Sequence, residues 1–158
     1  MIHQLEMAIW LAVASLGFAV LFNVPKRTLV VIALLSSLGG SCKLILINYN
    51  IHIVIATFFG ALLIGLLSIP AAHNKHTPPL VFSIPAVIPM IPGAFAYKAM
   101  LGFIKLTENT SQTAYDIALN ETISNGIIAA FILLALTAGV SFPMLISRKE
   151  SIKTMKLK

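Results

Sequence analysis

The chain has 158 residues, of which 58% are hydrophobic and 10% are charged, and its mean hydropathy is +0.95. Soluble domains have about 45–50% apolar and about 25% charged residues, so this composition excludes an ordinary soluble protein and predicts an integral membrane protein. The formal net charge of +6 does not imply a nucleic-acid partner, because the basic residues follow the sidedness of a membrane protein.

The sequence predicts an all-α protein with five transmembrane helices, each near or above the roughly 20 residues that a helix needs to cross the hydrocarbon core. The first predicted span covers residues 5–22, and Pro25 follows its end. Its N-terminal flank carries Glu6 rather than basic residues. We therefore interpret this segment as a retained span and not as a cleaved signal peptide.

The second and third spans are predicted at residues 28–47 and 51–69. The third is expected to end at Pro70, because proline breaks an α-helix, and the polar loop AAHNKHTPP follows. In lipid, small residues let helix backbones approach each other closely. We expect a small bundle that forms an oligomer or binds a partner. Its helices should pack closely, against each other or against a partner's helices, at Ala14, Gly17, the sequence SSLGGS at residues 36–41, Gly60 and Gly65.

The fourth span, at residues 80–104, is predicted to be broken by Pro85, Pro89 and Pro92. Each proline removes a backbone donor, and its ring clashes with the carbonyl four residues earlier. An unsatisfied backbone group in hydrocarbon costs several kcal/mol, so the break should line a cavity or be covered by neighbouring helices. The alternative is a kinked helix with a purely structural role.

A second half-helix is predicted to begin at Gly93, which permits a sharp turn and the close approach of a ligand. Its first amides could hold a substrate carboxylate, as the broken helices of transporters do. Tyr97 and Lys98 lie just beyond. Lys98 either contributes to such a site or extends to the outer surface. The same two alternatives apply to Lys43 in the second span, where extension to the surface is the favoured interpretation.

The fifth span is predicted at residues 118–146. Near its start, Glu121 and Asn125 lie four residues apart on one helical face. This polar stripe could line an exit path or pair with Lys98 or Lys105, or it could be a solvated first turn. The solvated turn is the favoured interpretation for Glu121, and Asn125 is kept as a candidate substrate-binding residue.

The basic residues predict how the chain is oriented. An odd number of spans places the two termini on opposite sides, and basic residues concentrate in cytoplasmic loops. This predicts an external N-terminus, a cytoplasmic C-terminus and a basic tail at residues 147–158 that binds anionic lipids of the cell's inner membrane. Only Lys105 falls on the external side, and the cytoplasmic side holds Lys26, Arg27, Lys75, Arg148, Lys149, Lys153, Lys156 and Lys158.

The sequence contains no recognisable catalytic or nucleotide-binding motif. The single cysteine, Cys42, has no intrachain disulfide partner, and the four histidines are scattered, so we expect no metal and no cofactor. The two remaining classes are a transporter and a structural or assembly subunit of the membrane without a substrate site of its own.

Three sequences carry a family resemblance: PAVIPMIPGAFAYKAM at residues 85–100, GFAVLFNVPKRTL at residues 17–29 and NIHIVIATFFGALLIG at residues 50–65. With the five-span layout they resemble the small YjjB-type subunit of the threonine/serine exporter (ThrE) family. The most specific element is Pro92-Gly93-x-x-Ala96-Tyr97. Lys43 stands where the family pattern often has arginine.

The resemblance implies export of threonine and serine, or of dicarboxylates such as succinate, by a two-component exporter whose second component is a larger YjjP-like membrane subunit. No ATP-binding motif is present, so coupling to the proton gradient is expected. An acidic relay is hard to find in the predicted spans, which suggests that the coupling group lies on the partner. The candidate substrate-binding residues are Pro89, Pro92, Gly93, Tyr97, Lys98, Lys43 and Asn125.

Overall fold

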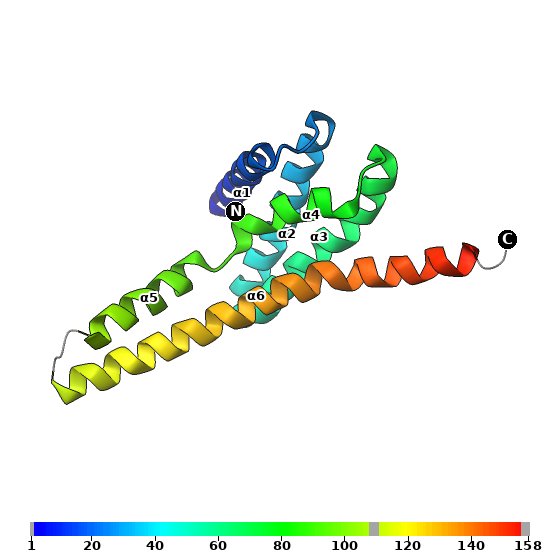
Figure 1. The fold of residues 1–158 in the computed structure, drawn as a ribbon. Helices are drawn as coiled ribbons and strands as arrows, with labels where there is room; N and C mark the ends of the chain where they lie inside the picture. Colours follow the sequence, from blue (N-terminus) through cyan, green and yellow to red (C-terminus); the bar gives the residue numbers. More distant parts are fainter. Residues whose placement is uncertain (1, 108–110, 156–158) are drawn as a thin grey trace. The chain divides into compact units, whose positions relative to one another are not determined.

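The computed structural model describes residues 2–107 and 111–155, and all regular secondary structure in these ranges is helical. Lys156 and Lys158 of the predicted tail lie outside the described residues. The described part contains six α-helices and two short 3₁₀ turns, and Figure 1 labels the α-helices. In chain order these are α1 (Ile2–Leu21), η1 (Lys26–Thr28), α2 (Leu29–Asn48), α3 (Ile53–Lys75), α4 (Pro79–Val87), η2 (Ile88–Met90), α5 (Gly93–Thr107) and α6 (Gln112–Met155).

Four helical segments are long and apolar enough to cross a membrane: 4–21, 26–48, 53–75 and 112–147. The interrupted pair of Pro79–Met90 and Gly93–Thr107 passes the same test when taken together, which gives up to five spans within the described residues. The predicted all-helical membrane architecture is therefore confirmed with four to five spans. The sides on which the termini lie stay a prediction.

The third helix does not end at Pro70, which corrects the sequence prediction. It continues to Lys75 and ends where His76 adopts a left-handed conformation, with φ of 50°. The backbone N–H groups of His76 and Thr77 both donate to the Ala72 carbonyl there. A proline removes only one intrahelical hydrogen bond, and membrane helices tolerate that loss where neighbouring groups compensate. The left-handed cap, and not the proline, therefore ends α3.

The last helix is longer than the predicted span of residues 118–146. It begins at Gln112, continues through Pro143 and ends at Met155, a length of 44 residues. At about 1.5 Å per residue it extends about 66 Å, roughly twice the thickness of the hydrocarbon core. Part of α6 must therefore lie outside the hydrocarbon, and its uncharged run at residues 122–147 is long enough to cross it.

The contacts divide the chain into two compact units. The first, here called the bundle, comprises the described residues of 1–90 and 135–158. The second, here called the hairpin, comprises residues 91–134, with α5 and the first half of α6. The sequence interpretation of one five-span domain stays a prediction.

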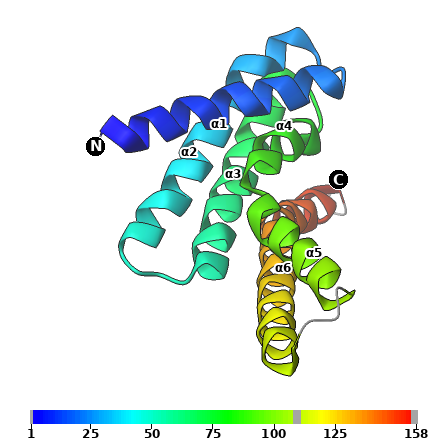
Figure 2. The ribbon, with the colours of Figure 1, turned by 90° about the vertical axis from the view of Figure 1, so that its left-hand side faces the viewer.

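Glycines bring the helices of the bundle close together. Helix α2 packs against α1 and α3, and α4 packs against all three (Figure 2). A Cβ atom on Gly60 of α3 would lie 2.6 Å from the Gly39 carbonyl oxygen of α2. A Cβ atom on Gly65 would lie 2.9 Å from the Val140 carbonyl oxygen of α6. The predicted close packing at Gly39, Gly60 and Gly65 is therefore confirmed.

Gly17 of α1 does not follow this pattern. A Cβ atom on Gly17 would meet no other atom within 4 Å, and Ala14 is exposed. These two positions therefore make no close helix contact within this chain, and packing against a partner's helix there stays a prediction. Helix α1 is instead held by hydroxyl groups, because Ser36 and Ser37 of α2 donate to the carbonyl oxygens of Leu11 (3.1 Å) and Ala8 (2.9 Å).

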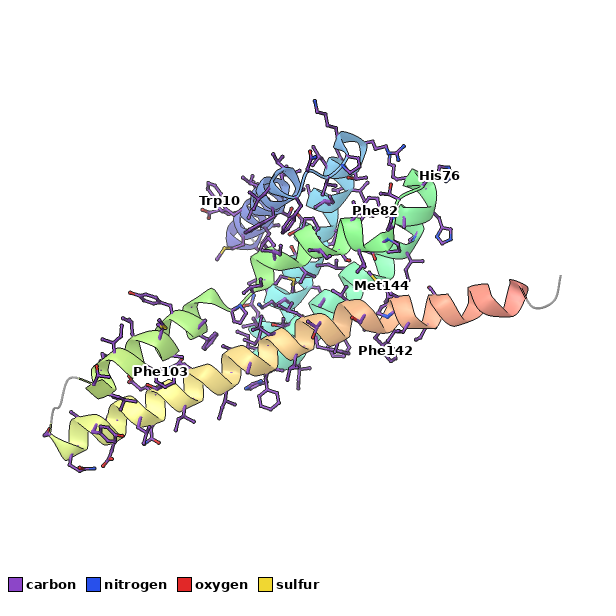
Figure 3. The ribbon with its side chains drawn as sticks, viewed as in Figure 1. Trp10, His76, Phe82, Phe103, Phe142 and Met144 are labelled. Carbon is purple, nitrogen blue, oxygen red and sulfur yellow. The ribbon has the colours of Figure 1, made fainter. Side chains whose placement is uncertain are left out.

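The core and the outer face of the bundle differ in the usual way for a membrane protein. Phe82 of α4 is fully buried, as are Ile32 and Ile64, whereas Trp10 of α1 is 63% exposed and projects outward in Figure 3. Exposed large apolar side chains recur along α1 and α2. Such a surface suits lipid, and would be costly against water.

In the hairpin, α5 lies alongside the first half of α6 (Figure 1). Gly102 of α5 lies so close to Thr122 of α6 that a Cβ atom would overlap the threonine hydroxyl. That hydroxyl donates to the Ala118 carbonyl oxygen of its own helix at 2.6 Å. Farther along, a Cβ atom on Gly126 would lie 3.9 Å from the Ala99 Cβ. These two contacts fix the register of the two antiparallel helices.

Candidate functional site

The fourth predicted span is interrupted in the structure. Helix α4 continues through Pro85 and gives way after Val87 to the 3₁₀ turn η2, and α5 begins at Gly93. Pro89 and Pro92 have no N–H to donate to the carbonyls four residues earlier, which accounts for the interruption there. Pro85 is fully buried in the bundle. The α4 side of the break is therefore covered by protein, as the cost of bare backbone in hydrocarbon requires.

Lys43 of α2 bonds to the edge of this break. Its Nζ atom donates to the Met90 carbonyl oxygen at 3.2 Å. In a continuous helix that oxygen would accept from the N–H of Ala94, but the helix is interrupted before α5 begins. Met90 is 3% exposed and Lys43 is half-buried. The Lys43 ammonium therefore satisfies a freed backbone carbonyl inside the bundle, which corrects the favoured interpretation that it extends to the surface.

Two glycines make room for Lys43 at this point. A Cβ atom on Gly60 would lie 2.7 Å from the Met90 Cε and 3.3 Å from the Lys43 Cβ, in addition to its contact with Gly39. Gly39 lies one turn before Lys43 on α2. Because neither glycine carries a side chain, α2, α3 and η2 meet closely enough for the lysine to reach the break.

The hairpin contains a polar groove of about 250 Å³. Four of its lining residues share one face of α5, at the helical spacing i, i+3, i+4 and i+7, and two lie four residues apart on α6. These residues are Lys98, Leu101, Gly102 and Lys105 of α5, and Glu121 and Asn125 of α6. The structure therefore brings the sequence candidates Lys98 and Asn125 together and adds Lys105 and Glu121, which were not among the candidates.

The groove residues are arranged in pairs along the hairpin. Lys98 and Lys105 lie seven residues apart on α5, so their Cα atoms are separated by about 10 Å along the helix axis. Opposite them, the Asn125 amide nitrogen donates to the backbone oxygen of Glu121 at 2.7 Å, which holds that side chain along the groove face of α6. The spacing of the two lysines was the signal available in the sequence for adding Lys105.

The groove lies at one end of the apolar part of α6. The uncharged run of α6 covers residues 122–147, so Glu121 directly precedes it and Asn125 lies within its first turn. Glu121 therefore lies at the end of the uncharged run that is nearer to the segment joining α5 to α6. Lys98, Lys105 and Glu121 are all exposed, whereas Asn125 is half-buried.

The other sequence candidates occupy different positions. Pro92 is buried and Pro89 is half-buried, whereas Tyr97 is 65% exposed and does not line the groove. Gly93 has no positive φ, and a Cβ atom there would meet no atom within 4 Å. The turn into α5 therefore does not depend on glycine at this position, and the close approach of a ligand to Gly93 stays a prediction. Lys43 belongs to the bundle and the groove belongs to the hairpin, so they are two separate features.

The side chains of the groove can bind a small ionic molecule through charge-assisted hydrogen bonds. Two ammonium groups, one carboxylate and one amide line it, and charge-assisted hydrogen bonds are the strong ones for holding a small ionic molecule. Across the described residues, no group of three or more His, Cys, Asp or Glu side chains is arranged to hold a metal ion.

The comparisons with known proteins cover nearly all of this structure. The family model described as "Threonine/Serine exporter, ThrE" matches residues 7–146, a range that includes Lys43, the break and the whole groove. An uncharacterized protein of Haemophilus influenzae is 36% identical over 150 residues, which make up 95% of this chain and 50% of that relative. The chain thus spans about half the length of the curated relative that it matches. No solved structure matches it.

Proposed function

Because this chain belongs to the threonine/serine exporter (ThrE) family, we propose that it is the small, YjjB-type subunit of a secondary exporter for small carboxylate-bearing metabolites. The substrates are threonine and serine, or dicarboxylates such as succinate. The groove of the hairpin is the part of this subunit that binds them, and it opens on the outer side of the inner membrane.

The observation that supports this proposal best is the pair of lysines in the groove. Charged side chains in membrane helices are costly, and they generally face a pathway or a partner. Lys98 and Lys105 lie on one face of α5 and line the same groove with Asn125. A carboxylate leaving the membrane interior meets ammonium groups there, and each charge-assisted hydrogen bond holds it more strongly than a neutral one would.

Lys43 has a different role in this proposal. Its ammonium bonds to Met90 at the interruption between η2 and α5, so it positions the broken helix rather than holding the substrate directly. Broken helices at the substrate site are a recurring device of secondary transporters. In this proposal Lys43 stabilises the end of η2, on the bundle side of the break.

We propose that a larger YjjP-like membrane subunit completes the exporter. The chain spans about half the length of the curated relative that it matches, and the resemblance to the YjjB-type subunit implies the larger partner. Coupling to the proton gradient is assigned to that partner, since the charged groups of the groove are placed for binding. The external N-terminus and the cytoplasmic C-terminus belong to this proposal, because they put the groove on the outer side.

The test is efflux from cells that express both subunits and are loaded with threonine through a peptide. Lys98→Gln removes one ammonium group from the groove and is expected to lower efflux about tenfold, the effect of losing one charge-assisted bond. The control is Lys75→Gln, which removes a lysine from the last turn of α3, away from the groove lining. Unchanged export of threonine and succinate in a Lys98→Gln/Lys105→Gln double variant would favour the structural subunit instead.

A further inference from the structure

The groove contains one negative side chain among its positive ones. Glu121 of α6 lines it together with Lys98 and Lys105. The negative charge of Glu121 would repel a substrate carboxylate. A site that only had to attract carboxylates would therefore gain nothing from it. The presence of Glu121 therefore carries information about the substrate.

The register of the hairpin places Glu121 between the two lysines. The close approach of Gly102 to Thr122 and of Gly126 to Ala99 fixes how α5 and α6 align. In that alignment Glu121 lies at the level of residues 103–104 of α5, nearer to Lys105 than to Lys98. Asn125 lies one turn farther along, near the level of Lys98. The groove thus presents a carboxylate beside one ammonium group and an amide beside the other.

We infer that Glu121 determines which charge type of substrate the groove accepts: its carboxylate binds the α-ammonium group of a zwitterionic amino acid and repels the second carboxylate of a dicarboxylate. This inference rests on the proposed function. In an α-amino acid the ammonium and carboxylate groups are attached to the same carbon. Binding both requires an anion and a cation side by side, which Glu121 and Lys105 supply.

The remaining contacts suit a hydroxy amino acid. The groove volume of about 250 Å³ equals the share of about eight molecules in liquid water, which is room for an amino acid the size of threonine. The Asn125 side chain offers amide hydrogen-bonding groups to the substrate hydroxyl, and Lys98 remains for the carboxylate on its way out. A dicarboxylate that reached from Lys98 to Lys105 would place negative charge against Glu121.

The experiment compares threonine and succinate efflux from cells that express both subunits and are loaded with both compounds. Glu121→Gln keeps the shape of the side chain and removes its charge. We expect threonine efflux to fall about tenfold and succinate efflux to rise relative to threonine. Glu121→Asp keeps the charge and is expected to keep the preference for threonine. Asp116→Asn is the matched control, since it removes a carboxylate from the same helix outside the groove lining.

The outcomes separate the two proposals. Equal changes in threonine and succinate efflux in Glu121→Gln, or no change in either, would overturn the role of Glu121 while Lys98→Gln still lowers export. If the two-subunit exporter moved neither compound before any substitution, the proposed function and this inference would both be wrong. A shift of preference in Asp116→Asn equal to that in Glu121→Gln would also overturn the inference, because the effect would then come from net charge alone.

Discussion

Lys43 in the bundle and Lys98 in the hairpin are both lysines in otherwise apolar helices, but their surroundings differ. The Lys43 ammonium donates to the Met90 carbonyl oxygen, which the interrupted helix leaves without its usual partner. Lys98 is exposed and lines a groove with residues of both charges. A lysine in a membrane helix can thus serve the protein's own backbone or a ligand, and the nearby acceptor decides which.

The largest expected effect tests whether the bundle depends on the close contact beside Lys43. Gly60→Leu would drive a side chain into the Gly39 carbonyl oxygen and the Met90 side chain, so we expect a loss of about 3 kcal/mol of stability or failure to fold. Size-exclusion chromatography and thermal melting in detergent measure it. Gly17→Leu is the control, because nothing lies within 4 Å of its Cβ position. A normal melting temperature in Gly60→Leu would contradict the packing described for α2, α3 and η2.

The next prediction tests the contact between α5 and α6 in the hairpin, again by replacing a glycine with a larger residue. Gly102→Ala places a methyl group against Thr122 and should separate α5 from α6, at a cost of about 2 kcal/mol and with loss of efflux. Gly126→Ala adds a methyl group 3.9 Å from Ala99, an ordinary contact, and is expected to leave efflux intact. Efflux and melting are measured for both variants. Equal behaviour of the two would show that the groove does not depend on this register.

The contrast between the two lysines is tested directly by substituting each with methionine. Lys43→Met leaves the Met90 carbonyl oxygen without its donor and is expected to cost about 1–2 kcal/mol of stability. Lys98→Met should leave the melting temperature near that of the wild type and reduce efflux. Lys43→Arg retains donors and should recover part of the stability. If Lys43→Met had the melting temperature of the wild type, the hydrogen bond from Lys43 to the Met90 carbonyl oxygen would not contribute to stability.

The smallest expected effect concerns the hydroxyl groups that hold α1 to α2. Ser37→Ala removes the bond to the Ala8 carbonyl oxygen and should cost about 0.6 kcal/mol, the average for hydrogen bonds between membrane helices. Ser15→Ala removes a bond within α1, to Ala12, and should not loosen the α1–α2 pair. Cross-linking of cysteines introduced on the two helices reports that pairing. If Ser15→Ala reduced cross-linking between α1 and α2 more than Ser37→Ala did, the Ser37 hydrogen bond would not be what holds the two helices together.

The sequence alone determined the class of the molecule and the order of its elements. Apolar runs of sufficient length predict helices in lipid because no other single segment satisfies its own backbone there. The prolines located the interruption near Pro92 for the same local reason. The family resemblance, based on elements such as Pro92-Gly93-x-x-Ala96-Tyr97, is confirmed by the family match over residues 7–146.

The ends of helices and the partners of charged residues were decided by tertiary structure. The sequence ended α3 at Pro70, but its left-handed cap at His76 lies six residues later. It favoured the surface for Lys43, because spacing along one helix does not show which helix faces it. Only the approach of α2 to η2 gave Lys43 an acceptor, and only the register of α5 on α6 set Glu121 between two lysines. Hydropathy can be calculated from a single segment of the sequence, whereas the groove forms only where two segments, α5 and α6, pack together.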